Sequence, residues 1–443
     1  MNTSKTYDLI GIGIGPFNLG LAALADQIEH LDYIFFDKQP AFNWHSGMLL
    51  EHARLQVPYQ ADLVTLADPT SRFSYLNYLH LEQRLIQLGI TEQYFITRKE
   101  YNQYCRWVVS ELDNLFFGME CVAVHYLEAS RLYSVKIRDI ASGSTFEFQA
   151  KRLVIGIGTV PSVPECALSF PCENIIHSSS YLFEKERLLQ QKKITIVGSG
   201  QSAAEIFYDL LQEPERFEHL HMFTRASDFF PMDYSRYALE KTSPEYIDYF
   251  FSLSNKKKKE VLSRQNALFK GINFSLIADI HDMQGAIRIL YPFKKNDLCT
   301  SSELRAISVV DDKDATSPAI KMDFWHREME KELVHYTGAV ILATGYKYEI
   351  PAFLQSVKDR IRFNEDGLYD VQRNYSIDYH NSIFAQNAEL HTHGFNAPDL
   401  GMGPYRNMVI INTILGSEHF KIPKRTAFQT FGIPTELTQR TDH

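Results

Sequence analysis

The chain has 443 residues, 45% of them hydrophobic and 22% charged, which is typical of a folded protein with two domains. A net charge of −9 argues against a nucleic-acid partner, because phosphate contacts need a concentrated basic surface. The one basic run, Lys256 to Lys259, is expected to be a solvated helix face. No apolar stretch could span a bilayer and no signal peptide precedes the first strand, so we expect a cytoplasmic protein with no membrane partner.

The five cysteines are scattered along the chain and none forms a CxxC pair. This pattern fits reduced thiols in a reducing compartment. It excludes the redox disulfide of a thioredoxin-reductase-like enzyme, and it gives no support to a metal site built from cysteines.

A glycine-rich turn near the start of the chain is flanked by a predicted strand, Tyr7 to Ile12, and a helical pattern that continues to Ile28. The turn contains Gly11, Gly13, Gly15 and Pro16. A second strand, Tyr33 to Phe36, ends at Asp37, which completes a βαβ unit. In such a unit the turn admits a pyrophosphate at the helix N-terminus, and the acidic residue accepts hydrogen bonds from the adenosine ribose.

A second βαβ unit begins with a strand from Ile194 to Val197 and continues as a helix from Ala203 to Leu211. The turn between them contains Gly198, Gly200, Gln201 and Ser202, with alanine in place of the third glycine. Its second strand, His221 to Thr224, is followed by Arg225 instead of an acid. A guanidinium there can pair with the 2′-phosphate of NADPH, so this unit is predicted to bind NADPH.

Four segments together resemble the flavin-dependent N-hydroxylating monooxygenases, the lysine and ornithine side-chain hydroxylases of siderophore synthesis. They are Phe42 to Met48, Gly198 to Glu205, Ala343 to Tyr346 and His391 to Gly394. The resemblance implies FAD and NADPH as cofactors. NADPH would reduce FAD, and O2 would then deliver one oxygen atom to an unprotonated primary amine. The partners would be this amine and O2, and the oligomeric state stays open, a homo-oligomer included.

The expected fold is α/β with two Rossmann-like dinucleotide-binding domains, the NADPH domain being inserted in the FAD domain. The predicted boundaries give an FAD domain from residues 1–161 and 338–443 and an NADPH domain from 162–337. Strands predicted at Leu153 to Ile157 and Ala339 to Ala343 each end in a small-residue turn, where the chain would cross between domains. The second of these turns contains Thr344, Gly345 and Tyr346, which we expect at the cofactor.

The resemblance also implies roles for individual residues. The residues lining the flavin would be Trp44, His45, Met48 and Gln56, with Leu400 in the C-terminal loop also at the cofactor. Asn273 would bridge the nicotinamide cofactor and the substrate, and Asn273 and Gln56 are the predicted catalytic residues. His391 and His393 would belong to a flavin-adjacent loop. On a strand, alternating histidines could share one face as metal ligands, but no carboxylate lies at ligand spacing, so no metal is expected.

Three positions depart from the amino-acid hydroxylases. Ala61 stands where the family has a lysine for the substrate carboxylate, Leu239 where it has Asn or Asp, and Gly401 where it has a serine. We therefore assign Ala61, Leu239, Gly401 and Asn273 to the substrate site and expect an amine without a carboxylate, namely histamine, putrescine or cadaverine. Ornithine or lysine is the alternative substrate. A Baeyer-Villiger or sulfur-oxidising flavin monooxygenase and a non-enzymatic nucleotide sensor rank lower.

Overall fold

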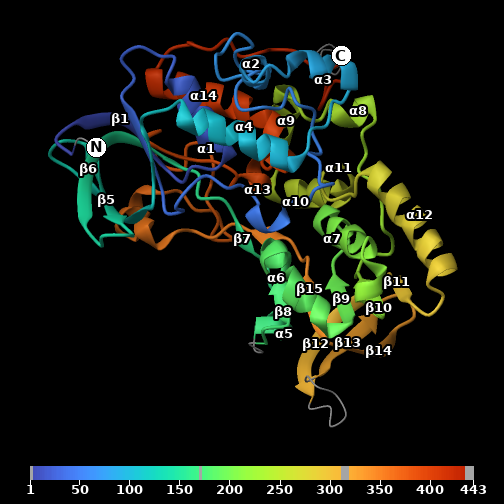
Figure 1. Ribbon diagram of the computed structural model, residues 1–443. Helices are drawn as coiled ribbons and strands as arrows, with labels where there is room; N and C mark the ends of the chain where they lie inside the picture. The colour runs from blue at the N-terminus through green and yellow to red at the C-terminus, as the bar shows by residue number, and fades with distance from the viewer. Residues whose placement is uncertain (1–2, 169–171, 311–318, 435–443) are drawn as a thin grey trace, which may run out of the picture.

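The computed structural model describes residues 3–168, 172–310 and 319–434. Two α/β lobes, each built around a sheet with parallel strands, lie at opposite ends of the molecule (Figure 1). The fold predicted from the sequence, with two dinucleotide-binding units, is confirmed. Within the described ranges, no helix combines the length and the apolar character needed to cross a bilayer.

The first sheet has seven strands in the order β3-β2-β1-β6-β5-β4, with β17 paired to β6. Strands β1, β2, β3, β6 and β17 pair with one another in parallel. On its other side β6 pairs with β5, and β6, β5 and β4 form an antiparallel meander. Residues from both ends of the chain build this sheet, because Ile383 of β17 pairs with Leu153 of β6. The bounds are Thr6–Ile12 (β1), Tyr33–Asp37 (β2), Leu115–Phe117 (β3), Met119–Leu127 (β4), Leu132–Asp139 (β5), Thr145–Ile155 (β6) and Ile383–Ala385 (β17).

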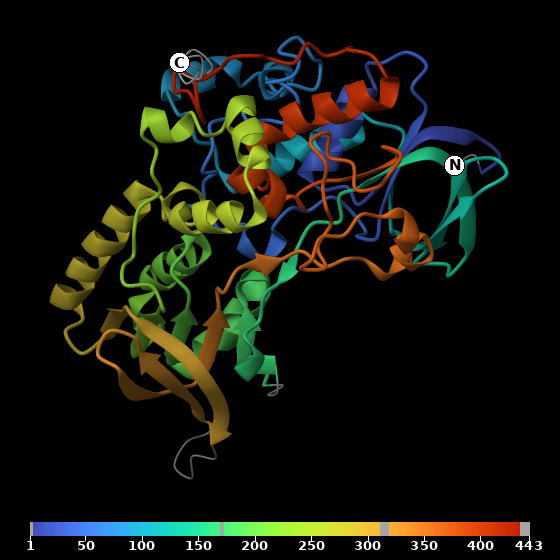
Figure 2. The ribbon, with the colours of Figure 1, turned by 180° about the vertical axis from the view of Figure 1, so that it is seen from behind.

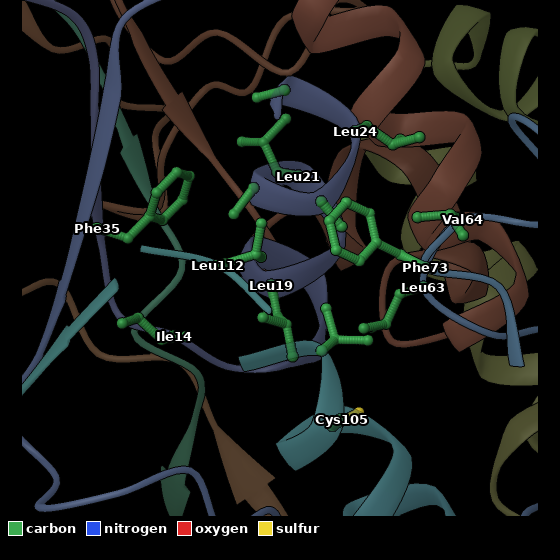
Figure 3. Close-up of a cluster of buried hydrophobic side chains, with 14 of the residues drawn as sticks. Ile14, Leu19, Leu21, Leu24, Phe35, Leu63, Val64, Phe73, Cys105 and Leu112 are labelled. Carbon is green, nitrogen blue, oxygen red and sulfur yellow. The ribbon is translucent and has the colours of Figure 1, made fainter. Parts of the chain in front are cut away.

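Helix α1 (Pro16–Ala25) lies in the centre of the first lobe, and Figure 3 shows its leucines packed among side chains from several segments. All but one of its residues are buried, and Asn18 is its one polar side chain, as expected of a core helix. It contacts α14 (Gly403–Leu415) and α4 (Arg98–Ser110). The helix ends at Ala25, before Ile28, where the apolar pattern predicted its end. This lobe also contains the helices α2 (Tyr75–Leu81), α3 (Leu85–Thr91), η5 (Ala352–Arg360) and α13 (Leu390–His393).

The second sheet has five parallel strands in the order β11-β10-β9-β15-β8. The bounds are Ile175–His177 (β8), Lys193–Val197 (β9), His219–Phe223 (β10), Lys295–Cys299 (β11) and Ala339–Leu342 (β15). Strand β15 belongs to this sheet, so the boundary predicted between residues 337 and 338 falls one strand too early. An antiparallel sheet of β12 (Ser302–Val310), β13 (Ala319–His326) and β14 (Lys331–Thr337) packs beside it.

Two short segments join the lobes. Strand β7 (Val160–Pro161) pairs with β16 (Tyr346–Lys347), so the outgoing and the returning chain cross side by side. The Thr344 hydroxyl donates to the Ser162 carbonyl oxygen at 2.6 Å, and the Ser162 N–H donates to Gly345 O at 2.9 Å. The crossing is therefore a hydrogen-bonded ribbon.

Four helices between the two lobes depart from the predicted domain division. They are α8 (Arg236–Leu239), α9 (Pro244–Ser252), α10 (Asn255–Arg264) and α11 (Asn266–Phe269). Figure 2 shows this yellow-green segment beside the red helix α14, and Ile247 of α9 packs against Met402 and Met408. Residues 236–269 thus pack on the first lobe, although the sequence placed them in the NADPH domain. Lys258 of α10 is buried with its ammonium over the Phe251 ring, so only part of the Lys256 to Lys259 run is a solvated helix face.

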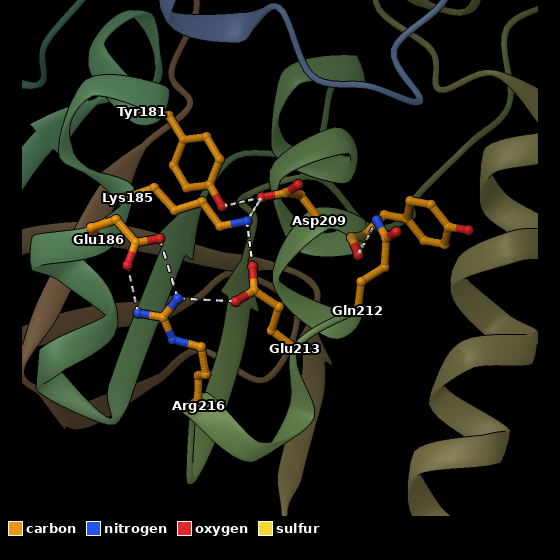
Figure 4. Close-up of polar contacts among 8 residues, drawn as sticks. Tyr181, Lys185, Glu186, Asp209, Gln212, Glu213 and Arg216 are labelled. Carbon is orange, nitrogen blue, oxygen red and sulfur yellow. Dashed lines mark hydrogen bonds and ion pairs between the residues drawn. The ribbon is translucent and has the colours of Figure 1, made fainter.

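An ion-pair network fixes the two helices that cover the second sheet near the crossing. In Figure 4, Lys185 of α6 (Tyr181–Leu188) contacts Asp209 of α7 (Gln201–Leu211) at 2.8 Å and Glu213 at 2.6 Å. Arg216 then joins Glu213 to Glu186 of α6. Because several charges share this network, it is expected to hold α7 against α6 better than an isolated surface pair would.

Candidate active site

The first glycine turn leaves the N-terminus of α1 open for an anion. Its N-cap is Gly15, which offers no side-chain cap, and a Cβ atom on Gly15 would meet nothing within 4 Å. A Cβ atom on Gly13, whose φ is +90°, would lie 2.4 Å from Gly156 O, so glycine is required there. Asp37 accepts from the Ile14 N–H at 2.6 Å and thereby braces the turn. These features fit the pyrophosphate and ribose of a dinucleotide.

The second turn has the same construction. Helix α7 begins after Gly200, again without a side-chain cap, whereas Ser74, Thr97, Ser243, Ser254 and Asn273 cap other helices with their side chains. A Cβ atom on Gly198 would lie 2.4 Å from Ala343 O, which brings the end of β15 against the turn. Ser202 lies in the first turn of α7. The two glycine turns, each between a parallel strand and a helix, therefore fit two dinucleotides, one for each sheet.

Arg225 lies just beyond β10, at the edge of the sheet where α7 begins, and its side chain is exposed. This is the edge where a 2′-phosphate is expected in such a fold. A second cation lies close by, because burial and the charge of Arg225 both lower the pKa of Lys270. Lys270 was not predicted from the sequence, and its backbone oxygen lies 3.7 Å from where a Cβ atom on Gly200 would be.

The residues expected at the flavin gather where the two lobes meet. Trp44 packs edge-on against His45, with ring centroids 4.5 Å apart, and His45 faces Tyr346 at 6.0 Å. Burial, with a smaller effect of Arg98, lowers the pKa of His45 to about 4, so this side chain is neutral at pH 7. Met48 is buried, and Leu400 lines a small cavity together with Pro16 of the first turn. The structure thus brings the N-terminal, central and C-terminal parts of the predicted site together.

A hydrogen-bond network joins the two predicted catalytic residues. Gln56 Nε2 donates to Gln201 Oε1 and to Gly271 O, both at 3.3 Å, and the Asn273 N–H donates to Gln201 Oε1 at 2.8 Å. The Asn273 side chain also caps α12 (Phe274–Leu290), since its Oδ1 accepts from the Ser275 N–H at 2.9 Å.

Two of the three departures from the amino-acid hydroxylases lie side by side. The Ala61 Cβ atom is 3.4 Å from the position that a Cβ atom on Gly401 would occupy, and Leu66 is 3.9 Å away. Asp399 Oδ1, at 3.0 Å, is nearer still and accepts from the Gly401 N–H at 2.7 Å. Leu239 is not among these three nearest neighbours; it lies on α8 with about half of its side chain exposed.

His391 and His393 lie in the helical turn α13 and not on a strand, so they do not share one face as the alternation suggested. His391 Nε2 lies 2.7 Å from Tyr369 O, and the His393 ring stacks on Tyr375 with centroids 4.5 Å apart. Burial lowers the pKa of both rings. Both side chains thus have partners within the protein. Among the described residues, no three His, Cys, Asp or Glu side chains are grouped so as to bind a metal ion.

Two glycine turns, each between a parallel strand and a helix and each in its own sheet, define a protein with two dinucleotide-binding sites. Residues 5–348 match the family model described as L-lysine 6-monooxygenase/L-ornithine 5-monooxygenase. The chain belongs to this family. It is an FAD- and NADPH-dependent N-hydroxylating monooxygenase.

Individual relatives match the chain over nearly its whole length. The putrescine N-hydroxylase of Shewanella oneidensis is 46% identical over 427 residues, which are 96% of this chain and 84% of the relative. The alcaligin biosynthesis enzyme of Bordetella pertussis is 42% identical over 438 residues, 98% of this chain and 93% of the relative. The crystal structure of FAD-bound DfoA, the cadaverine monooxygenase of desferrioxamine biosynthesis in Erwinia amylovora, superposes with a TM-score of 0.93 at 45% identity. It covers 97% of this chain and 99% of DfoA.

Besides Lys270, sequence reasoning missed three charged residues of this region: Asp399, Arg98 and Glu205. Asp399 lies two positions before Gly401, in the same C-terminal loop. Glu205 lies on the helix after the second glycine turn, one turn beyond Gln201, and is fully buried. An acidic residue so close to a phosphate-binding turn is unexpected, and that position was the available signal. Nothing in the local sequence indicates that Arg98 is its partner.

Proposed function

We propose that the enzyme N-hydroxylates an aliphatic diamine, putrescine or cadaverine, to supply hydroxamate siderophore biosynthesis. The observation that carries the proposal is the contact between Ala61 and the Gly401 position beside the carboxylate of Asp399. The relatives named above support it, because they act on putrescine or cadaverine or serve siderophore pathways.

An amino-acid substrate would bring a carboxylate into surroundings that cannot pair with it. Ala61 is buried, and Leu66, about half exposed, lies 3.9 Å from the Gly401 Cβ position, so these neighbours offer methyl groups and no cation. Arg406, whose charge acts on Asp399, is already paired with Glu389. Leaving a buried carboxylate unpaired costs several kcal/mol, and the nearby Asp399 would add like-charge repulsion. We therefore expect ornithine and lysine to be discriminated by about a hundredfold or more.

A diamine reverses this argument. One amino group is hydroxylated while the other stays an ammonium ion, and an ammonium ion needs an acceptor of opposite charge. Burial raises the pKa of Asp399, opposed by hydrogen bonds from the Gly401 and Met402 N–H groups and by the charge of Arg406. A bound ammonium would stabilise the ionised carboxylate. Asp399 is thus the group that we assign to the distal ammonium.

Histamine fits this arrangement less well than a diamine does. Its distal group is an imidazole, which is largely neutral at pH 7 because its ordinary pKa is about 6.5. It would give Asp399 a hydrogen bond but little charge. The relatives named above give histamine no support, so it is left out of the proposal.

The cofactors supply the oxidation. With NADPH as reductant, bound FAD would activate O2 so that one oxygen atom passes to the amine and the other leaves as water. The chain holds the amine, excludes water and leaves the amino group unprotonated. Trp44, Met48 and the neutral ring of His45 add no charge at the junction that would favour the ammonium form over the free amine. Such surroundings favour loss of the proton from the reacting nitrogen.

A panel of matched amines tests the proposal. Cadaverine, n-pentylamine and lysine share one carbon chain, but pentylamine lacks the distal amine and lysine adds a carboxylate. Hydroxylated product, measured by mass spectrometry, is the readout, because wasteful NADPH oxidation would not register. We expect cadaverine or putrescine to exceed both pentylamine and the amino acids in kcat/KM. Equal kcat/KM values for pentylamine and the diamines would show that Asp399 does not bind a distal ammonium. A preference for lysine or ornithine would refute the proposal.

A further inference from the structure

A buried ion pair connects the two lobes directly behind the second glycine turn. Arg98, the first residue of α4, donates from Nη1 and Nη2 to the two carboxylate oxygens of Glu205 on α7, at 2.8 Å and 2.7 Å. The Glu205 side chain is fully buried and that of Arg98 is 12% exposed. A bidentate pair of this kind constrains both distance and orientation between the two helices.

The pair also fixes the polarity of Gln201, the first residue of α7. Gln201 Nε2 donates to Glu205 Oε1 at 2.9 Å, and Gln201 Oε1 accepts from the Asn273 N–H at 2.8 Å. An ionised carboxylate only accepts and a backbone N–H only donates, so the amide satisfies both neighbours in just one orientation. The orientation of a side chain at the nucleotide turn therefore depends on Glu205, whose carboxylate is held in turn by Arg98 of the other lobe.

Neighbouring contacts show that the same junction is tightly packed. Arg98 Nη1 also donates to Met48 O at 3.1 Å, which ties the pair to the segment expected at the flavin. A Cβ atom on Gly47 would lie only 1.9 Å from Ser179 O of the second lobe. A shift of α7 relative to α4 would therefore disturb both predicted cofactor sites together.

We propose that Arg98 and Glu205 are positioning residues that lock the nicotinamide-binding turn in register with the flavin-binding lobe and orient the Gln201 amide for flavin reduction. Neither residue needs to touch the substrate. Reduction of FAD by NADPH precedes the reaction with the amine, so this role of Arg98 and Glu205 does not depend on whether the substrate is a diamine.

The double variant Arg98→Met/Glu205→Leu tests the proposal. It replaces both charges with apolar groups of similar size, which for buried pairs is often neutral for folding, whereas removal of one partner leaves an uncompensated charge. It also deprives Gln201 of its acceptor. The matched control is Arg138→Met/Glu120→Leu, which makes the same exchanges in a more exposed pair between the neighbouring strands β4 and β5 of the first sheet. Four properties are measured without any amine: the FAD content, the melting temperature, the anaerobic reduction of bound FAD by NADPH in a stopped-flow instrument, and the small-angle X-ray scattering profile of the free enzyme.

We expect the double variant to retain FAD and its melting temperature, to lose about tenfold or more in the limiting rate of flavin reduction, and to change its scattering profile. The control should match the wild type in all four properties. Wild-type reduction together with wild-type scattering would overturn the proposal. Loss of FAD or failure of the double variant to fold would overturn it as well, because the pair would then be a determinant of folding and not of position.

Discussion

The Cβ atom of Ala61 lies 3.4 Å from the point where a Cβ atom on Gly401 would be, although the two residues are far apart in the sequence. Both are among the smallest residues, and both stand where the resemblance to amino-acid hydroxylases implies a polar side chain. Their contact shows that two of the three departures alter one place in the molecule. Asp399 lies at the same place and supplies a negative charge.

Replacing Ala61 by lysine should impair diamine turnover. The new ammonium would lie within reach of Asp399 and compete with the distal ammonium of the substrate, so we expect the KM for putrescine and cadaverine to rise about ten- to hundredfold. The matched control is Ala61→Met, which adds similar length without charge. The ratio of ornithine to putrescine hydroxylation should increase in Ala61→Lys and not in the control. Equal effects of both variants would show that bulk, and not charge, is responsible.

Asp399→Asn separates charge from local structure. The asparagine carbonyl can still accept from the Gly401 N–H, so the capping contact at this turn is kept. We expect the KM for a diamine to rise about tenfold or more, while pentylamine hydroxylation changes little. Steady-state hydroxylamine assays with both amines measure this difference. A parallel loss with both substrates would mean that Asp399 acts through the fold.

The pH profile should rise toward alkaline pH. A primary amine has a pKa near 10, so the neutral form that accepts oxygen becomes more abundant as pH increases. Because burial raises the pKa of Asp399, its carboxylate should become protonated at higher pH than an ordinary aspartate when no ammonium is bound. Diamine affinity should therefore fall as pH decreases through that pKa. His45, with a pKa of about 4, stays neutral from pH 6 to 9.

Single-turnover hydroxylation from pH 6 to 9 measures this profile, and a flat result would contradict the requirement for a free amine. Comparison with Asp399→Asn isolates the carboxylate. The variant should keep the alkaline rise in rate but lose the acid-side weakening of diamine binding.

Arg225→Ala should reduce the preference for NADPH over NADH. A charge-assisted phosphate contact contributes about 1.5–3 kcal/mol, so KM for NADPH should rise about ten- to hundredfold while KM for NADH changes little. Lys270 lies close to Arg225 and can retain part of the phosphate affinity, which places the single variant toward the lower end of this range. The corresponding Lys270→Ala variant checks that contribution. Equal changes for the two cofactors would remove Arg225 from the 2′-phosphate site.

The sequence predicted those parts of the fold that are determined by local patterns. Gly13 and Gly198 stand where a Cβ atom would meet backbone at 2.4 Å, so their turns can be recognised without a structure. The boundary near residue 337 was misplaced because β15 takes its place in the second sheet through pairing with β8 and β9, which lie more than a hundred residues earlier.

The parts of the site that were missed depend on tertiary contacts. The Arg98–Glu205 pair joins helices 107 positions apart in the chain, and no local spacing indicates such a partner.

Direct competition between cadaverine and lysine compares the two substrate classes in a single reaction. With equal concentrations of both amines, the ratio of the two hydroxylamine products gives the ratio of kcat/KM values, independent of enzyme concentration and of NADPH oxidised without product. We expect a ratio of at least about a hundred in favour of cadaverine, because lysine differs only by the carboxylate that the Ala61, Gly401 and Asp399 surface cannot accept. A ratio near one, or a preference for lysine, would contradict this expectation.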